Sequence, residues 1–372
     1  MNKLYPIKFT AEPRERVWGG NYLKNKLGKE FEKGKIGESW ELWSLFGKSS
    51  VVAEGFLAGN TLDDIIETYM GDAIGDRVFE FYKGDFPLLI KILDIEDRLS
   101  IQVHPDDQIA FEREDSYGKS EFWYIMDAKP DAKIYMGFNR DITPSEFYER
   151  CKNGTLEQVL NIFTPHIGDC IYIEPGCVHS AGNGVVIAEI QQASDVTYRL
   201  YDWGRENNPK TARRMDLEEA IDIIDYTKYN SERYYFPQVT GSKTIVDSSH
   251  FIIKTFDITE NIRIVPNILN SFIIYICTRG EAHIKMNDGT LYPIKRGETI
   301  YIPSGMEDFL LVPDKGNPHL LEVYMPQLEE DPDSYLDQDA EDEYHHHHDN
   351  EACSCHGHAH DHNHEHDAEH LK

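Results

Sequence analysis

Two stretches of the sequence share one pattern: GDCIYIEPGCVH at Gly168–His179 and GETIYIPSGMED at Gly297–Asp308. Each begins with a glycine and an acidic residue, continues with a strand-like segment containing tyrosine, and turns at a proline or glycine before a polar last residue. Repetition of this kind is typical of a duplicated structural unit. The sequence therefore predicts two copies of one β unit, and only the first copy ends in histidine, a common metal ligand.

The rest of the chain also favours β structure. Its apolar segments are short, rich in β-branched and aromatic residues, and bounded by glycine, proline and aspartate, which is the pattern of strands. The expected strands are Phe86–Leu93, Leu99–Val103, Cys170–Ile173, Val185–Ile190, Val196–Tyr201, Phe272–Cys277 and Glu298–Ile302. Helical spacing is confined to fewer segments, of which the clearest are Leu62–Tyr69, Thr143–Lys152 and Asp216–Ile224.

The repeated pattern resembles the second sequence signature of cupin barrels, in which the last position is a metal-binding histidine. This resemblance implies a mainly β fold made of two cupin-type (jelly-roll) β-barrels. We expect an N-terminal catalytic barrel in residues 1–205 with a small helical insertion near 143–163. A connecting segment at 206–240, a degenerate C-terminal barrel at 241–328 and a disordered acidic, His-rich tail at 329–372 would follow.

Composition and charge exclude several classes of protein. The 372 residues carry a formal net charge of −29, whereas binding nucleic acid requires a basic face. No window approaches the roughly 18 uninterrupted apolar residues of a membrane span, and the first residues lack the apolar core of a signal peptide. Six scattered cysteines in a chain of this length do not indicate a disulfide framework. These features predict a cytoplasmic protein with reduced thiols and neither nucleic-acid nor membrane partners.

The segment LSIQVHP, which begins at residue 99, places polar side chains on one face of a strand. Because side chains alternate along a strand, Ser100, Gln102 and His104 share one side while the apolar residues between them face the other. Burying such a row costs several kcal/mol unless the groups are used. Taken alone, the row is better explained by a solvated face.

A second polar row changes this interpretation. In GKSEFWY, from residue 118, alternation puts Lys119 and Glu121 on one face, and His179 follows the turn of the first repeat. Two imidazoles, a carboxylate and an amide oxygen can complete the ligand shell of a divalent cation and leave room for water or substrate. The combination with Gln102 and His104 therefore predicts a metal site.

A further stretch, AEIQQASDVTYRLYDWGR from residue 188, contains an arginine in an alternating strand. The pattern alone leaves open whether Arg199 faces a site or pairs with an acid at a rim. This stretch, together with VWGG, IGESWELW, FPLLIKILD, QVHPDD, GKSEFWYI and PGCVHS, resembles the type I phosphomannose isomerases in their short bacterial form. The resemblance covers roughly residues 5–326.

The resemblance implies a set of site residues. Its metal ligands would be Gln102, His104, Glu121 and His179, around one divalent cation for which zinc is the best match. Its catalytic residues would be Arg199 and Lys119. The substrate would contact Ser100, Lys119, Arg199 and Lys91, the last being a lone charge in an apolar strand.

The activity implied is a zinc-dependent aldose–ketose isomerisation that interconverts mannose 6-phosphate and fructose 6-phosphate, so the partner is a small hexose phosphate. The proton carrier stays open among a metal-bound water, Lys119 and a nearby carboxylate. Two other classes are alternatives at this point. One is an iron-dependent cupin oxygenase, and the other is a non-enzymatic regulator that binds sugar phosphate or metal.

The last 44 residues have a composition of their own. Eleven of the 17 histidines lie after residue 328, interspersed with aspartate and glutamate. Such a segment has too little apolar surface to fold by itself. Imidazole and thiolate ligands suit zinc or nickel, so the tail is also a candidate for binding additional divalent metal.

Overall fold

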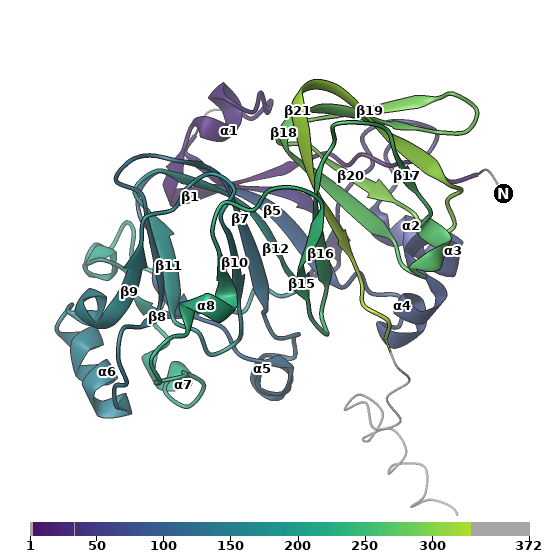
Figure 1. Ribbon diagram of the computed structural model, residues 1–372. Coiled ribbons are helices and arrows are strands. Elements are labelled where there is room, and N and C mark those ends of the chain that lie inside the picture. Colours follow the sequence, from purple (N-terminus) through teal and green to yellow (C-terminus); the bar gives the residue numbers. More distant parts are fainter. Residues whose placement is uncertain (1–2, 33, 329–372) are drawn as a thin grey trace, which may run out of the picture. The chain divides into compact units, whose positions relative to one another are not determined.

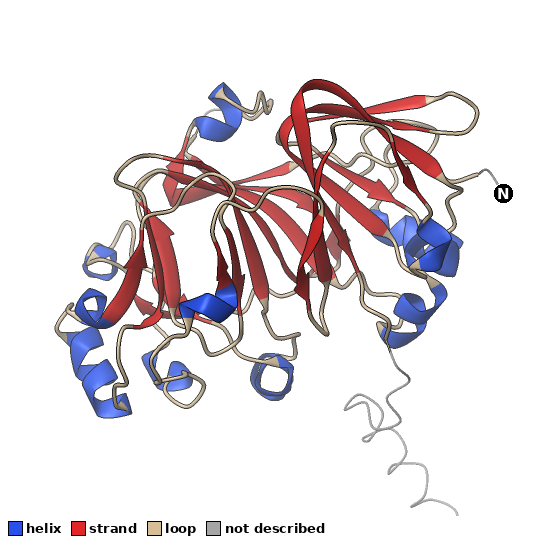
Figure 2. Ribbon diagram, viewed as in Figure 1, coloured by secondary structure: helices blue, strands red, loops and turns tan. Residues whose placement is uncertain are grey.

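Antiparallel strands are the predominant regular elements of the structure, a computed structural model that describes residues 3–32 and 34–328 (Figures 1 and 2). The prediction of a mainly β protein is confirmed. The predicted disordered His-rich tail, residues 329–372, lies outside the described residues. Among the helices described, none combines the length and the apolar composition needed to cross a bilayer.

Two sheets form the part of the fold that carries the predicted site residues. The first sheet has seven strands in the order β1 (Glu12–Gly20), β2 (Ile36–Leu42), β5 (Leu88–Ile95), β12 (Val185–Gln192), β7 (Glu121–Ala128), β10 (Cys170–Ile173) and β14 (Tyr235–Phe236). The second has five, in the order β13 (Tyr198–Tyr201), β6 (Ile101–Val103), β11 (His179–Gly182), β8 (Lys133–Phe138) and β9 (Leu160–Phe163).

The first and second sheets share one apolar core. Trp123 and Ile187 from the first sheet pack in the same buried cluster as Ile134, Met136 and Ala181 from the second. Burial of the alternate residues on each inner face holds two such layers together. The polar members of the same inner faces are the predicted site residues.

A third sheet contains the second copy of the repeat. Its strands are ordered β15 (Lys243–Asp247), β16 (Ile252–Asp257), β21 (Phe309–Tyr324), β18 (Ile273–Lys285) and β19 (Leu291–Lys295), with β17 (Ile262–Ile264) paired to β21 and β20 (Thr299–Ile302) to β18. The N-terminal segment reaches this sheet, because Ile7 pairs with Tyr301 of β20. A fourth, two-stranded sheet joins β3 (Ser44–Leu45) to β4 (Lys48–Ser49).

The repeat corresponds to equivalent strands in the two copies. The residues of β10 and β20 occupy the same positions within their copies of the pattern, and each strand pairs antiparallel with a longer one, β7 or β18. Ile173 of β10 lies opposite Glu121, whereas the matching Ile302 of β20 lies opposite Ile273. The second copy therefore has an apolar residue where the first has a carboxylate.

Helices are short and lie outside the sheets (Figure 2). They are α1 (Tyr22–Asn25), α2 (Leu62–Tyr69), α3 (Gly71–Ile74), α4 (Asp76–Phe81), α5 (Asp107–Glu114), α6 (Pro144–Lys152), α7 (Leu217–Ala220) and α8 (Ser231–Tyr234). Three single 3₁₀ turns are η1 (Leu156–Val159), η2 (Arg205–Asn207) and η3 (Pro266–Ile268).

Some predicted boundaries were wrong. The helix predicted at Asp216–Ile224 is only α7, and the helical insertion predicted near 143–163 ends in strand β9. Helix α5, which no periodic pattern predicted, begins where the Asp106 side chain accepts a hydrogen bond from the backbone N–H of Ile109. Such local capping decides short helices more than apolar spacing does.

The prediction of closed barrels is not confirmed. Within the described residues, hydrogen bonding joins the strands into separate sheets, none of which closes on itself. Alternation along a strand indicates which face is buried, but two packed sheets bury that face as well as a barrel does. The division of the chain at residues 205 and 240 stays a prediction.

Candidate metal and substrate site

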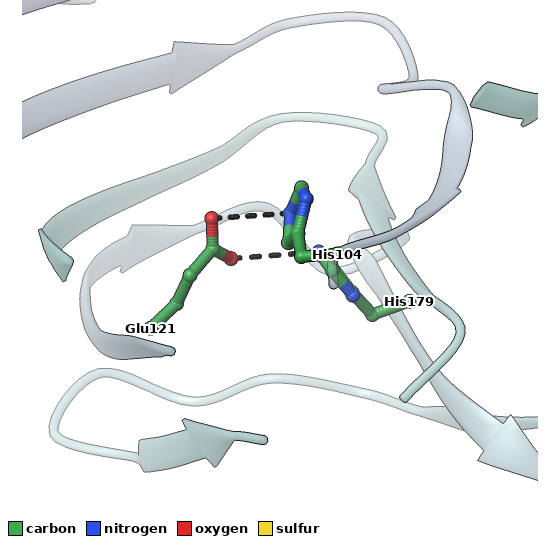
Figure 3. A group of neighbouring side chains, drawn as sticks. All are labelled: His104, Glu121 and His179. Atoms are coloured by element: carbon green, nitrogen blue, oxygen red, sulfur yellow. Dashed lines mark ion pairs between the residues drawn. The ribbon is translucent and has the colours of Figure 1, made fainter. Parts of the chain in front are cut away.

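Three buried side chains meet between the first and second sheets (Figure 3). Glu121 begins β7, His179 begins β11, and His104 follows β6. The Nε2 atom of His104 lies 3.3 Å from Glu121 Oε1, and that of His179 lies 3.4 Å from Glu121 Oε2. One ligand atom from each residue lies within 4.8 Å of the others. The structure therefore brings together three of the four predicted metal ligands in a cluster that could hold a cation.

Backbone contacts determine which ring nitrogens face the cluster. The Nδ1 atom of His104 lies 2.9 Å from the carbonyl oxygen of Val196, and that of His179 lies 2.9 Å from the carbonyl oxygen of Cys177. A carbonyl oxygen only accepts, so each Nδ1 carries the proton and donates. Each Nε2 consequently presents a lone pair to Glu121, the arrangement typical of metal-binding histidines.

These groups fit a divalent cation. Two imidazole lone pairs and an ionised carboxylate are all acceptors, so they repel one another unless a positive charge lies among them. Neither oxygen of Glu121 accepts a well-directed hydrogen bond within the described residues, although both oxygens are buried. The set of nitrogen and oxygen donors suits zinc and similar divalent metals.

Gln102, the fourth predicted ligand, lies beside this cluster. It is paired with His179 across β6 and β11, and its Nε2 donates to His179 Nε2 at 3.3 Å. Its Oε1 accepts from Ser100 Oγ at 3.4 Å. Rotating the amide by half a turn exchanges these atoms and directs the oxygen into the cluster. Its position fits a ligand, and its role stays a prediction.

Lys119 supplies a positive charge at the cluster. Its Nζ lies 2.5 Å from Glu121 Oε1 and donates to His104 Nε2 at 3.2 Å. Burial, followed by the charge of Lys119, lowers the pKa of His104 to about 3. Burial alone would raise the pKa of Glu121, but Lys119 and His104 outweigh it and hold that pKa well below its ordinary value. The carboxylate is therefore ionised, and the lone pair on Nε2 of His104 remains available.

A second set of buried polar groups lies on the same face of the first sheet. Lys91 of β5 is paired with Glu189 of β12, which is paired with Trp123 of β7. The Nζ of Lys91 lies 3.0 Å from Glu189 Oε2 and 2.5 Å from Gln191 Oε1, while the indole of Trp123 donates to Glu189 Oε1 at 2.9 Å. Burial lowers the pKa of Lys91, but Glu189 and other carboxylates raise it above its ordinary value.

Lys91 was predicted at the site, but Glu189 was not. Glu189 lies in the quoted AEIQQ segment, where only its cross-strand pairing with Lys91 reveals that it faces the interior. No spacing along its own strand carries that signal. The negative charge opposite Lys91 balances a cation that would otherwise be expensive to bury.

Arg199 reaches the site from the edge strand β13. Its Nε donates to Ser100 Oγ at 3.2 Å and its Nη1 to the carbonyl oxygen of Arg214 at 3.0 Å. In the part of the chain that the structure describes, its guanidinium forms no ion pair with a carboxylate. This geometry leaves donors free to bind an anion, and the role of Arg199 stays a prediction.

The second copy of the repeat has no equivalent site. Asp308, at the position of His179, forms an ion pair with Arg263. The position that matches Glu121 in the strand pairing is occupied by Ile273, which has no carboxylate. The cluster of His104, Glu121 and His179 is the one group of metal-capable side chains among the described residues.

Comparisons with known proteins show the family of the chain. The family description "Phosphomannose isomerase type I, catalytic domain" matches residues 7–136. The mannose-6-phosphate isomerase ManA of Bacillus subtilis is 31% identical over 314 residues, covering 82% of this chain and 95% of that protein. The chain belongs to the type I phosphomannose isomerase family.

Membership of the phosphomannose isomerase family makes the protein an isomerase, so the alternatives of an oxygenase and a non-enzymatic regulator are set aside. The mannose-6-phosphate isomerase of Streptococcus mutans is 27% identical and covers 82% of this chain and 94% of its own. The crystal structure of the mannose 6-phosphate isomerase from Bacillus subtilis superposes with a TM-score of 0.72 at 29% identity, covering 86% of this chain and 99% of that one. A mutant of the phosphomannose isomerase from Salmonella typhimurium, 16% identical with a TM-score of 0.68, shares the fold.

Proposed function

We propose that the protein interconverts mannose 6-phosphate and fructose 6-phosphate with one bound divalent cation, zinc. The observation that carries the proposal is the convergence of His104, Glu121 and His179 in a family of phosphomannose isomerases. The donor set supports zinc, and Gln102 would supply a further oxygen once its amide is rotated. Such an ion, when bound, supplies a Lewis acid for the carbonyl and hydroxyl oxygens of the sugar.

The chain's own residues would bind the substrate and stabilise its charge. Isomerisation moves a proton between C1 and C2 of the sugar and develops negative charge on the oxygens of an enediolate. Arg199, with Ser100 beside it, is placed to donate charge-assisted hydrogen bonds to that charge or to the phosphate. Lys119 and Lys91 add positive charge on the opposite wall, and burial strengthens their effect on a bound anion.

Proton transfer requires a group that can both take and return a proton. We assign Lys119 as a candidate because its ammonium lies within the cluster, and Glu189 is the nearby carboxylate that the sheet register adds. Geometry comes before pKa in choosing between them. Activity of Lys119→Met and Glu189→Gln, each compared at equal metal content, distinguishes the two.

We also propose that the two β units descend from one duplicated cupin-type unit, with the site kept in residues 1–205 and lost in 241–328. Residues 206–240 would connect them. The matching positions of β10 and β20 support this history. The replacement of Glu121 and His179 by Ile273 and Asp308 accounts for the loss of the second site.

A coupled assay tests the proposed activity. Purified protein should convert mannose 6-phosphate to fructose 6-phosphate, lose activity after dialysis against a chelator, and regain it with added Zn²⁺. Protein that is fully active after complete metal removal would contradict the metal requirement. Absence of turnover on either sugar phosphate in the metal-loaded protein would contradict the assigned substrate.

A further inference from the structure

The segment 202–216, which we call the return loop, begins where β13 ends, and its last residue contacts Arg199 in that strand. The backbone N–H of Arg199 donates to Asp216 Oδ2 at 3.0 Å, and the backbone N–H of Asp216 donates to the carbonyl oxygen of Arg199 at 2.8 Å. Arg199 Nη1 also donates to the carbonyl oxygen of Arg214. The return loop therefore holds both the main chain and the guanidinium of Arg199.

One carboxylate ties the two ends of the return loop together. Asp202 is fully buried. Arg205 Nη2 donates to its Oδ1 at 2.6 Å, and Arg213 donates to both oxygens, from Nη2 at 2.6 Å and from Nε at 3.1 Å. Bidentate pairing of this kind fixes orientation as well as adding energy. Arg213 directly precedes Arg214, so the same contact sets where the carbonyl of Arg214 lies.

The turn after Asp202 has a strained backbone and contacts the segment that precedes Ser100. Trp203 has a φ of 59°, in the left-handed region that a bulky residue rarely adopts. Its indole donates to the carbonyl oxygen of Leu99 at 2.5 Å, and the guanidinium of Arg98 lies 3.9 Å over its ring. Leu99 precedes Ser100, the partner of Arg199 Nε. Strain of this kind persists where surrounding contacts impose it, and it concentrates at functional sites.

We propose that Asp202 is a positioning residue that acts through Arg199. By holding Arg205 and Arg213, its carboxylate sets the return loop so that the Arg214 carbonyl and Ser100 orient the Arg199 guanidinium toward the substrate. This inference rests on the proposed function, in which Arg199 binds the anionic substrate. Asp202 itself touches neither the metal cluster nor Arg199 through any hydrogen bond in the described residues.

A second consequence concerns charge. Arg213 and Arg199 are close enough that, after burial, the charge of Arg213 contributes to lowering the pKa of Arg199. The carboxylate of Asp202 offsets this repulsion, because it lies between two guanidinium groups of the loop. Removing its charge while keeping its shape should therefore release Arg213 and disorder the contact with Arg199.

A double-mutant cycle tests the proposal. Asp202→Asn should lower kcat about tenfold with unchanged metal content, because Arg199 is misoriented in the transition state. In the background of Arg199→Lys, the same substitution should cost less than about twofold, since two changes that act through one group do not multiply. If Asp202 were only structural, its cost would be the same in both backgrounds, and that result would overturn the proposal.

A matched control and a second variant complete the experiment. Glu219→Gln removes an equal charge from a part-exposed carboxylate that pairs with the side chain of Arg214, and it should leave kcat within about twofold. If Asp202→Asn does not fold, Arg213→Lys is the second variant. It replaces the two-point contact between the part-exposed Arg213 guanidinium and Asp202 with a single ammonium, and it should lower kcat at least about threefold. Wild-type kcat in Arg213→Lys would contradict the inference.

Cleavage by trypsin distinguishes failure of the inference from failure of the proposed function. The return loop contains Lys210, Arg213 and Arg214, and folded Asp202→Asn should be cut there faster than wild type or Glu219→Gln. Unchanged cleavage would count against positioning by Asp202 whatever the substrate is. A wild-type protein inactive on both sugar phosphates, with faster cleavage of Asp202→Asn, would contradict the proposed function alone.

Discussion

At the scale of single residues, the site depends on which atoms of each side chain are committed elsewhere. His104 and His179 each use Nδ1 on a backbone carbonyl, which leaves Nε2 for the cluster. Glu121 is buried with oxygens that lack well-directed donors. Arg199 donates one hydrogen bond to Ser100 and one to the carbonyl oxygen of Arg214. These contacts leave Nε2 of each histidine, the oxygens of Glu121 and the remaining Arg199 donors available for a cation or a substrate.

Loss of one imidazole should remove the metal and the activity together. We expect His179→Ala to bind less than about a tenth of an equivalent of zinc and to show no measurable turnover, because the site keeps only one imidazole and one carboxylate beside Gln102, which hold a cation weakly. Asp308→Ala, the matching change in the second copy, should leave both unchanged because Asp308 pairs with Arg263, away from the cluster of His104, Glu121 and His179. Elemental analysis of both variants in protein ending at Leu328, which lacks the eleven later histidines, and the coupled assay measure the two outcomes. Stoichiometric zinc in His179→Ala would refute the assigned ligand set.

Arg199→Lys should separate catalysis from folding. A removed donor to developing charge costs about 10²–10³ in rate, and an ammonium cannot reproduce the planar fork of a guanidinium. We therefore expect at least about a hundredfold loss of kcat, with normal zinc content and thermal midpoint. A variant that keeps more than about a tenth of wild-type kcat would show that Arg199 only assists binding.

At the scale of elements, strand register decides which residues share the site. The antiparallel pairing of β7 and β12 places Glu121 opposite Gln191, and the pairing of β6 and β11 places Gln102 opposite His179. A shift of one residue would turn these side chains to the other face of the sheet. The second copy has the equivalent strand β20, paired with β18, but it lacks the candidate ligands. The strand pairing therefore does not depend on the presence of the metal site.

Helix α2 offers a test of local structure far from the metal cluster. Thr61 Oγ1 accepts from the backbone N–H of Asp64, and Asp64 Oδ2 accepts from that of Thr61, which together form a capping box. We expect Thr61→Ala to lower the free energy of unfolding by about 1 kcal/mol. Urea denaturation measures it, with Thr61→Ser as the control that keeps the hydroxyl. A loss in Thr61→Ser as large as in Thr61→Ala would rule out the cap as the cause.

The effect of this cap should depend on pH. Hydrogen bonds from Thr61, first from its backbone and then from its side chain, lower the pKa of Asp64. A lowered folded pKa stabilises the fold above the unfolded value of about 3.9, and the contribution disappears as the pH falls through the folded pKa. The difference between Thr61→Ala and wild type should therefore be full at neutral pH and shrink in acid. A constant difference from pH 7 to about pH 3 would contradict this linkage.

At the scale of the whole molecule, residues Met1–Leu328 form a compact unit that contains the complete candidate site. We therefore expect a protein ending at Leu328 to keep kcat within about twofold of the full chain under saturating zinc, because no ligand is lost. Its elemental analysis also avoids zinc held by the eleven histidines beyond that point. A tenfold loss that added zinc does not restore would show that residues 329–372 contribute to the site.

The strand-rich character, the duplicated pattern, the candidate ligand types and the family could all be predicted from the amino-acid sequence. Alternation in LSIQVHP and GKSEFWY predicted which side chains share a face, since that relation is set within one strand. Alternation left the orientation of Arg199 open, and the resemblance of the surrounding motif to the family implied its place at the site. Helix boundaries near α5 and α7 were not predictable in this way, since caps and tertiary packing override short apolar patterns.

The pairing of strands that are distant in the sequence became visible only in the folded structure. Lys91 and Gln191 are 100 positions apart, and their contact follows from the pairing of β5 with β12. Asp202 binds Arg213 because the return loop folds back on β13. Periodicity along one strand carries no information about register with another, which the burial of whole sheet faces sets collectively. The candidate ligand types could therefore be predicted from the sequence. The contacts of Glu189 with Lys91 and of Asp202 with Arg213 depend on how the strands and the return loop pack.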